Sequence, residues 1–301
     1  MLNDNSKKPR TLINIIGIPF IIFSIYIGSI WFVLLMLFAL YICIKELSSM
    51  VLIKGYCIHE KVFHTFIILF LFHLKLFPEN ISSVVNTFLI FDFFELNILS
   101  YSAIIFLILE FSRRKNKFDV NNFLLNIFLI NWIFLGILSI IKIRFIDSSI
   151  WTTFSLNAGF YYIIIMFLAI WSCDSFAFIF GSKFGKKKIF PKTSPKKTWL
   201  GAFSGFIFTL LFLYFVLLLN DIFNFKINFT YYEVIFLSLI FGVISQFGDY
   251  IESYIKRKFN VKDSGTILQG HGGMLDRLDS LILVAPFFVL YLMFIEGFVI
   301  L

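Results

Sequence analysis

The sequence is poor in charged residues and in cysteine. Only 15% of its 301 residues are charged and 59% are hydrophobic, a balance that excludes an ordinary soluble domain of this length. The three cysteines, Cys43, Cys57 and Cys173, lack metal-type spacing, so neither a disulfide framework nor a zinc site is expected. Internal repeats and low-complexity linkers are also missing, so we expect a single integral membrane domain over 1–301.

Long apolar runs recur along the whole chain, which a single secretory signal does not explain. A membrane-spanning helix needs about 20 apolar residues. We therefore predict an all-α polytopic membrane protein with about nine transmembrane helices. Eight or ten remain alternatives, because the segment 84–96 contains Asp92 and Glu95 and is either interfacial, re-entrant or part of a tilted helix. The predicted spans lie near 12–29, 30–45, 62–77, 97–111, 122–142, 157–179, 199–219, 232–248 and 280–300.

Lysine and arginine gather in a few of the loops between these spans. If "KKPR" (7–10) is cytoplasmic, nine spans place the basic loops 46–61, 112–119, 181–198 and 249–279 on the same side. We therefore predict a cytoplasmic N-terminus and a protein integral to the cytoplasmic (inner) membrane. Apolar spans fill 1–156, and 157–301 forms a catalytic half whose polar loops share the cytoplasmic face.

One polar stripe continues the span 232–248 out of the membrane. In "FGDYIESYIKRKF" (247–259), Asp249, Ser253, Lys256 and Arg257 stand at i, i+4, i+7 and i+8, on one face of a helix. Snorkelling at the membrane interface would explain the two basic residues equally well. An acid at the edge of a span is costly, and Asp249 therefore indicates an ion or proton site.

The loop 262–279 before the last span is rich in glycine and acid. Its glycines, Gly265, Gly270, Gly272 and Gly273, allow main-chain N–H groups to approach an anion closely. Asp276 and Asp279 follow at i, i+3, and one capping aspartate would suffice for the helix N-terminus. Two acids flanking Arg277, after His271, favour a divalent-metal site with a cation for phosphate.

The loop 181–198 has seven lysines and no acid. Attraction to anionic lipid explains most of them. In "SPKKTWLG" (194–201), Pro195 is expected to form a rigid turn that aims Lys196 and Lys197 at the membrane boundary, where they suit a phosphate. Asp174, near the cytoplasmic end of the span 157–179, is a further intramembrane acid. Together these groups indicate phosphoryl or nucleotidyl transfer at the inner leaflet.

At these residues the chain resembles the phosphatidate cytidylyltransferases, or CDP-diacylglycerol synthases. The resemblance covers roughly 160–300, and its motifs are Ser253-x-Ile255-Lys256-Arg257, Lys262-Asp263-x-Gly265, His271-Gly272-Gly273-x-x-Asp276-Arg277-x-Asp279, Asp174-Ser-x-Ala-x-x-x-Gly181 and Ser194-Pro-Lys-Lys-Thr-Trp-x-Gly201. Two positions depart from the family pattern: Gln269 stands where proline is usual, and Phe178 where tyrosine is usual. Neither affects the acids or the lysines.

The resemblance implies that CTP and phosphatidate react to give CDP-diacylglycerol and pyrophosphate, with Mg²⁺ and a second cation such as K⁺. Asp249 and Asp276 would hold Mg²⁺, with Asp279 as a third ligand or behind them. The groups expected to neutralise phosphates are Lys196, Lys197, Lys256, Arg257 and Arg277. The remaining substrate-binding candidates are Asp174, Ser194, Ser253, Lys262, Asp263, His271, Gly272 and Gly273. Membrane lipids are expected partners, nucleic acid is not, and a homodimer would fit.

Two other functions remain open on sequence grounds. A CTP-dependent lipid kinase of the dolichol or phytol type would share the nucleotide but release CDP. A cation-coupled transporter would use intramembrane acids, but its site would lie near the bilayer midplane between repeated halves. The CDP-alcohol phosphatidyltransferase pattern is absent, and a structural scaffold would not need a glycine loop with three carboxylates.

Overall fold

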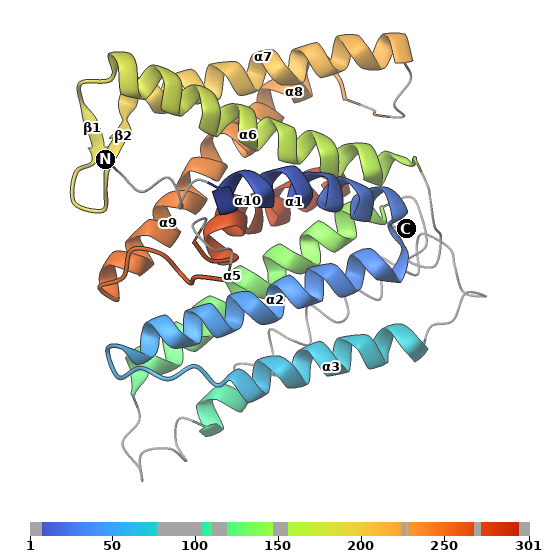
Figure 1. Cartoon of the computed structure of the whole chain (residues 1–301). Coiled ribbons are helices and arrows are strands. Elements are labelled where there is room, and N and C mark those ends of the chain that lie inside the picture. Colours follow the sequence, from blue (N-terminus) through green and yellow to red (C-terminus); the bar gives the residue numbers. More distant parts are fainter. Residues whose placement is uncertain are drawn as a thin grey trace.

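The computed structural model describes residues 8–76, 104–109, 119–146, 156–223, 227, 229–267 and 272–294. Long helices make up nearly all of this part of the chain, and one short hairpin projects from one end (Figure 1). The elements are α1 (Lys8–Ile27), α2 (Ser29–Leu52), α3 (Glu60–Leu76), α5 (Val120–Arg144), α6 (Ala158–Phe184), β1 (Lys188–Phe190), β2 (Ser194–Thr198), α7 (Trp199–Phe223), α8 (Tyr231–Ser238), η3 (Leu239–Ile244), α9 (Ser245–Lys258) and α10 (Leu275–Phe294).

Five described helices are long and apolar enough to cross a membrane. They are α2, α5, α6, α7 and the continuous segment Tyr231–Lys258, and they contain five of the predicted spans. This confirms the prediction of an all-α membrane protein. Helices α1, α3 and α10 overlap three further predicted spans. The segment 84–96 and most of 97–111 lie outside the described residues, so the count of nine stays a prediction.

Helix α10 lies among α5, α9, α2 and α6 and contacts all four. Its residues Ile282, Ala285 and Phe288 have no exposed surface. Gly136 of α5 permits the close approach, because a Cβ there would lie 2.4 Å from the Ile282 carbonyl oxygen. The first turn of α10 is thereby fixed against the helices that carry the other polar groups.

Helices α6 and α7 pack side by side along one edge of the bundle (Figure 1). A Cβ on Gly201 of α7 would lie 2.7 Å from the Ala177 carbonyl oxygen, and one on Gly205 2.9 Å from that of Cys173. Small residues at such an interface allow two backbones to meet closely in a membrane. The hairpin between the two helices therefore leaves from a rigid base.

A π-helical turn, η3, interrupts the helical segment that leads to Asp249. The Gly242 carbonyl accepts hydrogen bonds from Gln246 Nε2 at 2.7 Å and from Cys173 Sγ at 3.3 Å. A π turn holds an extra residue and so rotates every residue that follows it. The direction of the polar stripe on α9 therefore depends on this turn.

The lysine-rich segment 188–198 is an antiparallel hairpin, with Lys188 opposite Thr198 and Phe190 opposite Ser194. The predicted turn at Pro195 is wrong, since Pro195 lies within β2. Proline is tolerated there because both strands of a two-stranded ribbon are edges. Phe190 stacks on Tyr250 of α9, with ring centroids 3.8 Å apart, and this contact fixes the hairpin beside α9.

Candidate active site

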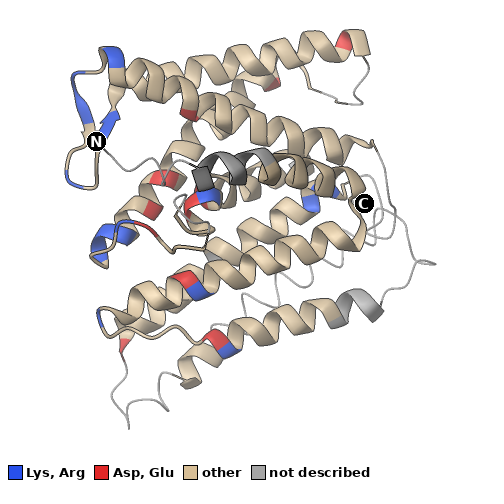
Figure 2. Cartoon of the chain, in the orientation of Figure 1, with Lys and Arg blue, Asp and Glu red and all other residues tan. Residues whose placement is uncertain are grey.

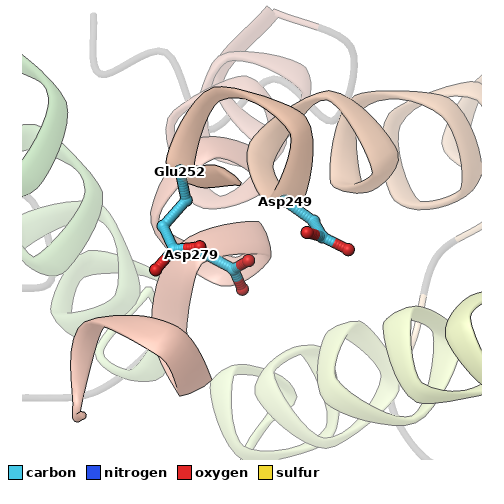
Figure 3. Close-up of side chains that lie close together, drawn as sticks. All are labelled: Asp249, Glu252 and Asp279. Carbon is cyan, nitrogen blue, oxygen red and sulfur yellow. The ribbon is translucent and has the colours of Figure 1, made fainter. Parts of the chain in front are cut away.

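Three carboxylates meet between α9 and α10. One oxygen each of Asp249, Glu252 and Asp279 lies within 4.8 Å of the other two. Figure 3 shows Glu252 leaving α9 toward Asp279 on α10, with Asp249 on the same helix beside them. Carboxylate oxygens are the preferred ligands of hard divalent cations. Since Glu252 is only 2% exposed and its Oε1 has no hydrogen-bond partner within the described part of the chain, this acidic trio fits a bound cation.

Close packing brings Asp279 to this position. A Cβ on Gly248 would lie 2.8 Å from Ser280 Cα and 2.9 Å from the Asp279 carbonyl oxygen, so only glycine lets α10 approach here. Ser280 Oγ also donates to the Ser245 carbonyl oxygen at 3.0 Å. The meeting of Asp249 with Asp279 thus follows from the way α9 and α10 pack.

The hairpin supplies a cation to the trio. Lys197 Nζ of β2 lies 2.6 Å from Asp249 Oδ2, and their side chains are 25% and 36% exposed. Ser253 Oγ donates to the other Asp249 oxygen at 3.3 Å. Asp174 of α6 interacts electrostatically with both Asp249 and Lys197. The structure therefore brings together four of the predicted site residues from three separate motifs.

Asp276 is held by hydrogen bonds from the backbone before α10 and by an ion pair with Lys256. Its Oδ2 accepts from the backbone N–H groups of Ser264 at 3.0 Å and Gly273 at 2.8 Å, and its Oδ1 pairs with Lys256 Nζ at 2.7 Å. Burial opposes its ionisation, but the interactions with Glu252, Lys256 and the Gly273 N–H outweigh burial and hold its pKa well below the ordinary value. Asp276 thus holds the backbone just before α10, and Glu252 is the third acid beside Asp249 and Asp279. The role of Asp276 as a metal ligand stays a prediction.

Lys256 links Asp276 to the trio. Its Nζ lies 2.5 Å from Glu252 Oε2 and 2.7 Å from Asp276 Oδ1, and its side chain is 11% exposed. Snorkelling does not describe a lysine that pairs with Glu252 and Asp276, whose side chains are only 2% and 10% exposed. The interpretation of Lys256 as an ordinary basic helix end is therefore not supported.

The other predicted residues lie around this centre. Arg257 is exposed and donates to the Val261 carbonyl oxygen at 3.0 Å. Gly272 has φ +81°, and a Cβ there would lie 2.4 Å from Asp276 Oδ2. His271 and Gln269 lie outside the described residues. The residues exposed to solvent are Lys196, Lys262, Asp263 and Arg277, while Ser194 is half-buried.

Two buried acids were missed by the sequence reasoning. Glu252 stands three residues after Asp249 and four before Lys256, so helical spacing alone could have identified it. Glu46 follows Lys45 at the start of the predicted loop 46–61, so its local sequence resembles an ordinary charged end of a span and gave no signal of burial.

Two cavities flank α9. One of about 140 Å³ lies beside Lys196 and Lys197, with Phe178, Phe190 and Gln246 among its walls. A larger one of about 660 Å³ is lined mostly by apolar residues of α5 and α9. The α9 residues that line it lie on the helix face opposite Asp249 and Glu252. The smaller cavity therefore adjoins the polar site, and the larger one does not.

These features define a class of protein: a helical membrane enzyme whose acids and lysines suit the transfer of a charged group. The model of the cytidylyltransferase family matches residues 8–295. The phosphatidate cytidylyltransferase of Staphylococcus saprophyticus is 30% identical over 280 residues, which cover 93% of this chain and 96% of the relative. That of Rickettsia felis is 47% identical over 128 residues, or 41% of this chain and 55% of the relative. The chain therefore belongs to the cytidylyltransferase family and is a nucleotidyltransferase.

Proposed function

We propose that this protein transfers CMP from CTP to phosphatidate, giving CDP-diacylglycerol and pyrophosphate. The observation that carries the proposal is the acidic trio beside Lys197, at the end of helices long enough to span a membrane. The names of the relatives support the same reaction.

The reaction requires alignment and charge neutralisation more than a strong base. A phosphate oxygen of phosphatidate, already ionised at neutral pH, attacks the α-phosphorus of CTP. The bond between that phosphorus and the oxygen bridging to the β-phosphate breaks, and pyrophosphate leaves with its electron pair. Several anionic groups must meet, so the protein lowers the barrier by orienting them and offsetting their charge.

We propose that Asp249, Glu252 and Asp279 hold Mg²⁺, with Asp276 adjacent to them through Lys256. The bound ion would neutralise charge on the triphosphate. Lys197, and with it Lys196, would contact phosphates from the hairpin side. Arg257 and Arg277, at the exposed ends of α9 and α10, would bind more distant phosphates. A second cation such as K⁺ is part of the same proposal.

The site would face the cytoplasm from the inner membrane. Figure 2 places much of the lysine and arginine on the hairpin and the adjoining end of α9, which is the pattern of a cytoplasmic surface. Nine spans with a cytoplasmic N-terminus would agree with this orientation. A homodimer is expected from the resemblance to the family.

The test is an assay of the purified protein in detergent with radiolabelled CTP, phosphatidate and Mg²⁺. We expect labelled CDP-diacylglycerol and an equal amount of pyrophosphate, both dependent on phosphatidate. Release of CDP would indicate a lipid kinase, and pyrophosphate release without phosphatidate would also overturn the proposal. Cation movement across vesicles without nucleotide turnover would support a transporter.

A further inference from the structure

Glu46 lies in the apolar helix α2, yet its hydrogen-bond partners belong to the loop before α10 and to the first residue of α10. Its Oε1 accepts from the backbone N–H of Met274 at 2.8 Å. Its Oε2 accepts from Ser264 Oγ at 2.8 Å and from the backbone N–H of Leu275 at 3.0 Å. The side chain is only 4% exposed. A buried carboxylate from the N-terminal half therefore receives the first N–H groups of α10, where a negative charge is favourable.

Two of the loop glycines are shaped around this carboxylate. A Cβ on Gly265 would lie 2.6 Å from Glu46 Oε1, and one on Gly273 would lie 2.3 Å from Oε2. Any larger residue would displace Glu46 or the loop. These glycines therefore make room for the Glu46 carboxylate of the same chain. From the sequence, they were expected to let main-chain N–H groups approach a substrate anion, and that role does not require a fit to Glu46.

A continuous set of polar contacts leads from Glu46 to the acidic trio. Ser264, held by Glu46 through its hydroxyl, donates its backbone N–H to Asp276. Asp276 pairs with Lys256, and Lys256 pairs with Glu252 of the trio. Groups that orient metal ligands from behind typically change metal affinity or activity by about 10–100-fold when removed.

We propose that Glu46 is a positioning residue of the transferase site: it holds Ser264 and the start of α10 so that Asp276 and Lys256 keep Glu252 directed into the acidic trio. The expected effect of Glu46 on turnover rests on the proposed function. It assigns part of the active-site support to α2, in the half of the chain predicted to contain only apolar spans.

The test compares Glu46→Gln with Glu233→Gln. Glu233 also caps a helix, since its Oε2 accepts from the Thr230 N–H at 2.6 Å, but it lies in the capping box of α8. Glutamine keeps the size of Glu46 and loses one of its two acceptor oxygens. We expect Glu46→Gln to weaken Mn²⁺ binding, followed by electron paramagnetic resonance, and to raise the apparent Mg²⁺ constant for turnover, each by about tenfold. Amide exchange in 262–279 should also be faster, and Glu233→Gln should match the wild type.

The proposal is overturned if Glu46→Gln binds Mn²⁺ as the wild type does, if loop exchange is unchanged, or if Glu233→Gln is equally impaired. A wild type that binds no Mn²⁺ also overturns it. A wild type that binds Mn²⁺ but makes no CDP-diacylglycerol overturns the proposed function alone, and the exchange and binding measurements then still decide on Glu46. Should Glu46→Gln fail to fold, Ser264→Ala removes one of the three hydrogen bonds, and we expect about threefold weaker Mn²⁺ binding.

Discussion

Replacing Asp279 with asparagine should stabilise the metal-free protein and remove its response to Mg²⁺. At the 4.8 Å limit between oxygens of the trio, two like charges repel by about 3.5 kcal/mol at an effective dielectric constant near 20. The partial exposure of Asp249 and its pairing with Lys197 reduce this to about 1 kcal/mol. Asparagine keeps the acceptor that receives the Ser280 N–H at 2.7 Å, so mainly the charge is lost.

The assay is thermal unfolding of the detergent-purified protein at pH 8, above the pKa of Asp279, which burial and the nearby Asp249 charge raise to about 7. In EDTA, Asp279→Asn should raise Tm by about 2–4 °C for each kcal/mol of repulsion removed. In Mg²⁺ at 100 times its Kd, the wild type should gain about 2.7 kcal/mol and the variant much less. Asp221→Asn, at the exposed end of α7, is the matched control and should change neither value. A lower Tm in EDTA, or an undiminished Mg²⁺ response, would refute the assignment of the trio as a cation site.

Three further predictions follow from the same contacts. Lys197→Met should lower turnover in the CTP assay by at least about tenfold, a barrier change of about 1.4 kcal/mol, because it removes the cation beside the trio. The control Lys192→Met, in the exposed hairpin turn, should stay within about twofold of the wild-type turnover. Asp276→Asn should lower Tm in EDTA, opposite in sign to the Asp279 variant, because breaking charged hydrogen bonds at a helix cap costs about 1–3 kcal/mol; an unchanged Tm would contradict its capping role. Gly201→Ala should destabilise the α6–α7 contact by about 1–3 kcal/mol in thermal unfolding, whereas Gly17→Ala, with nothing within 4 Å of the added Cβ, should not.

Hydropathy predicted the described spans well because a bilayer imposes nearly the same apolar length on every helix. The spans near 122–142, 157–179 and 199–219 lie inside α5, α6 and α7. The hairpin was not predicted, since short strands leave no such length signature. The π-helical turn was also missed, because composition does not reveal one extra residue in a turn.

The contacts of the candidate site could be predicted from sequence only where helical spacing determines the direction in which a side chain points. Helical spacing correctly grouped Asp249 with Ser253. Lys197 lies beside Asp249, and its expected contact with phosphate stays a prediction. Asp276 also accepts the backbone N–H groups of Ser264 and Gly273, which the i, i+3 spacing with Asp279 did not indicate, and its role as a metal ligand stays a prediction. Glu46 could not be paired from sequence, as its partner Ser264 lies 218 positions away.

The reach of Glu46 across the chain also bears on the order in which the molecule forms. Glu46 is synthesised 218 residues before Ser264, so its carboxylate lacks this hydrogen-bond partner through most of translation. Insertion of the early helices therefore leaves the centre incomplete. The nascent protein can acquire its transfer chemistry only when its final segments reach the ribosome exit, and truncated chains lack the ligand side chains and the contact that holds them.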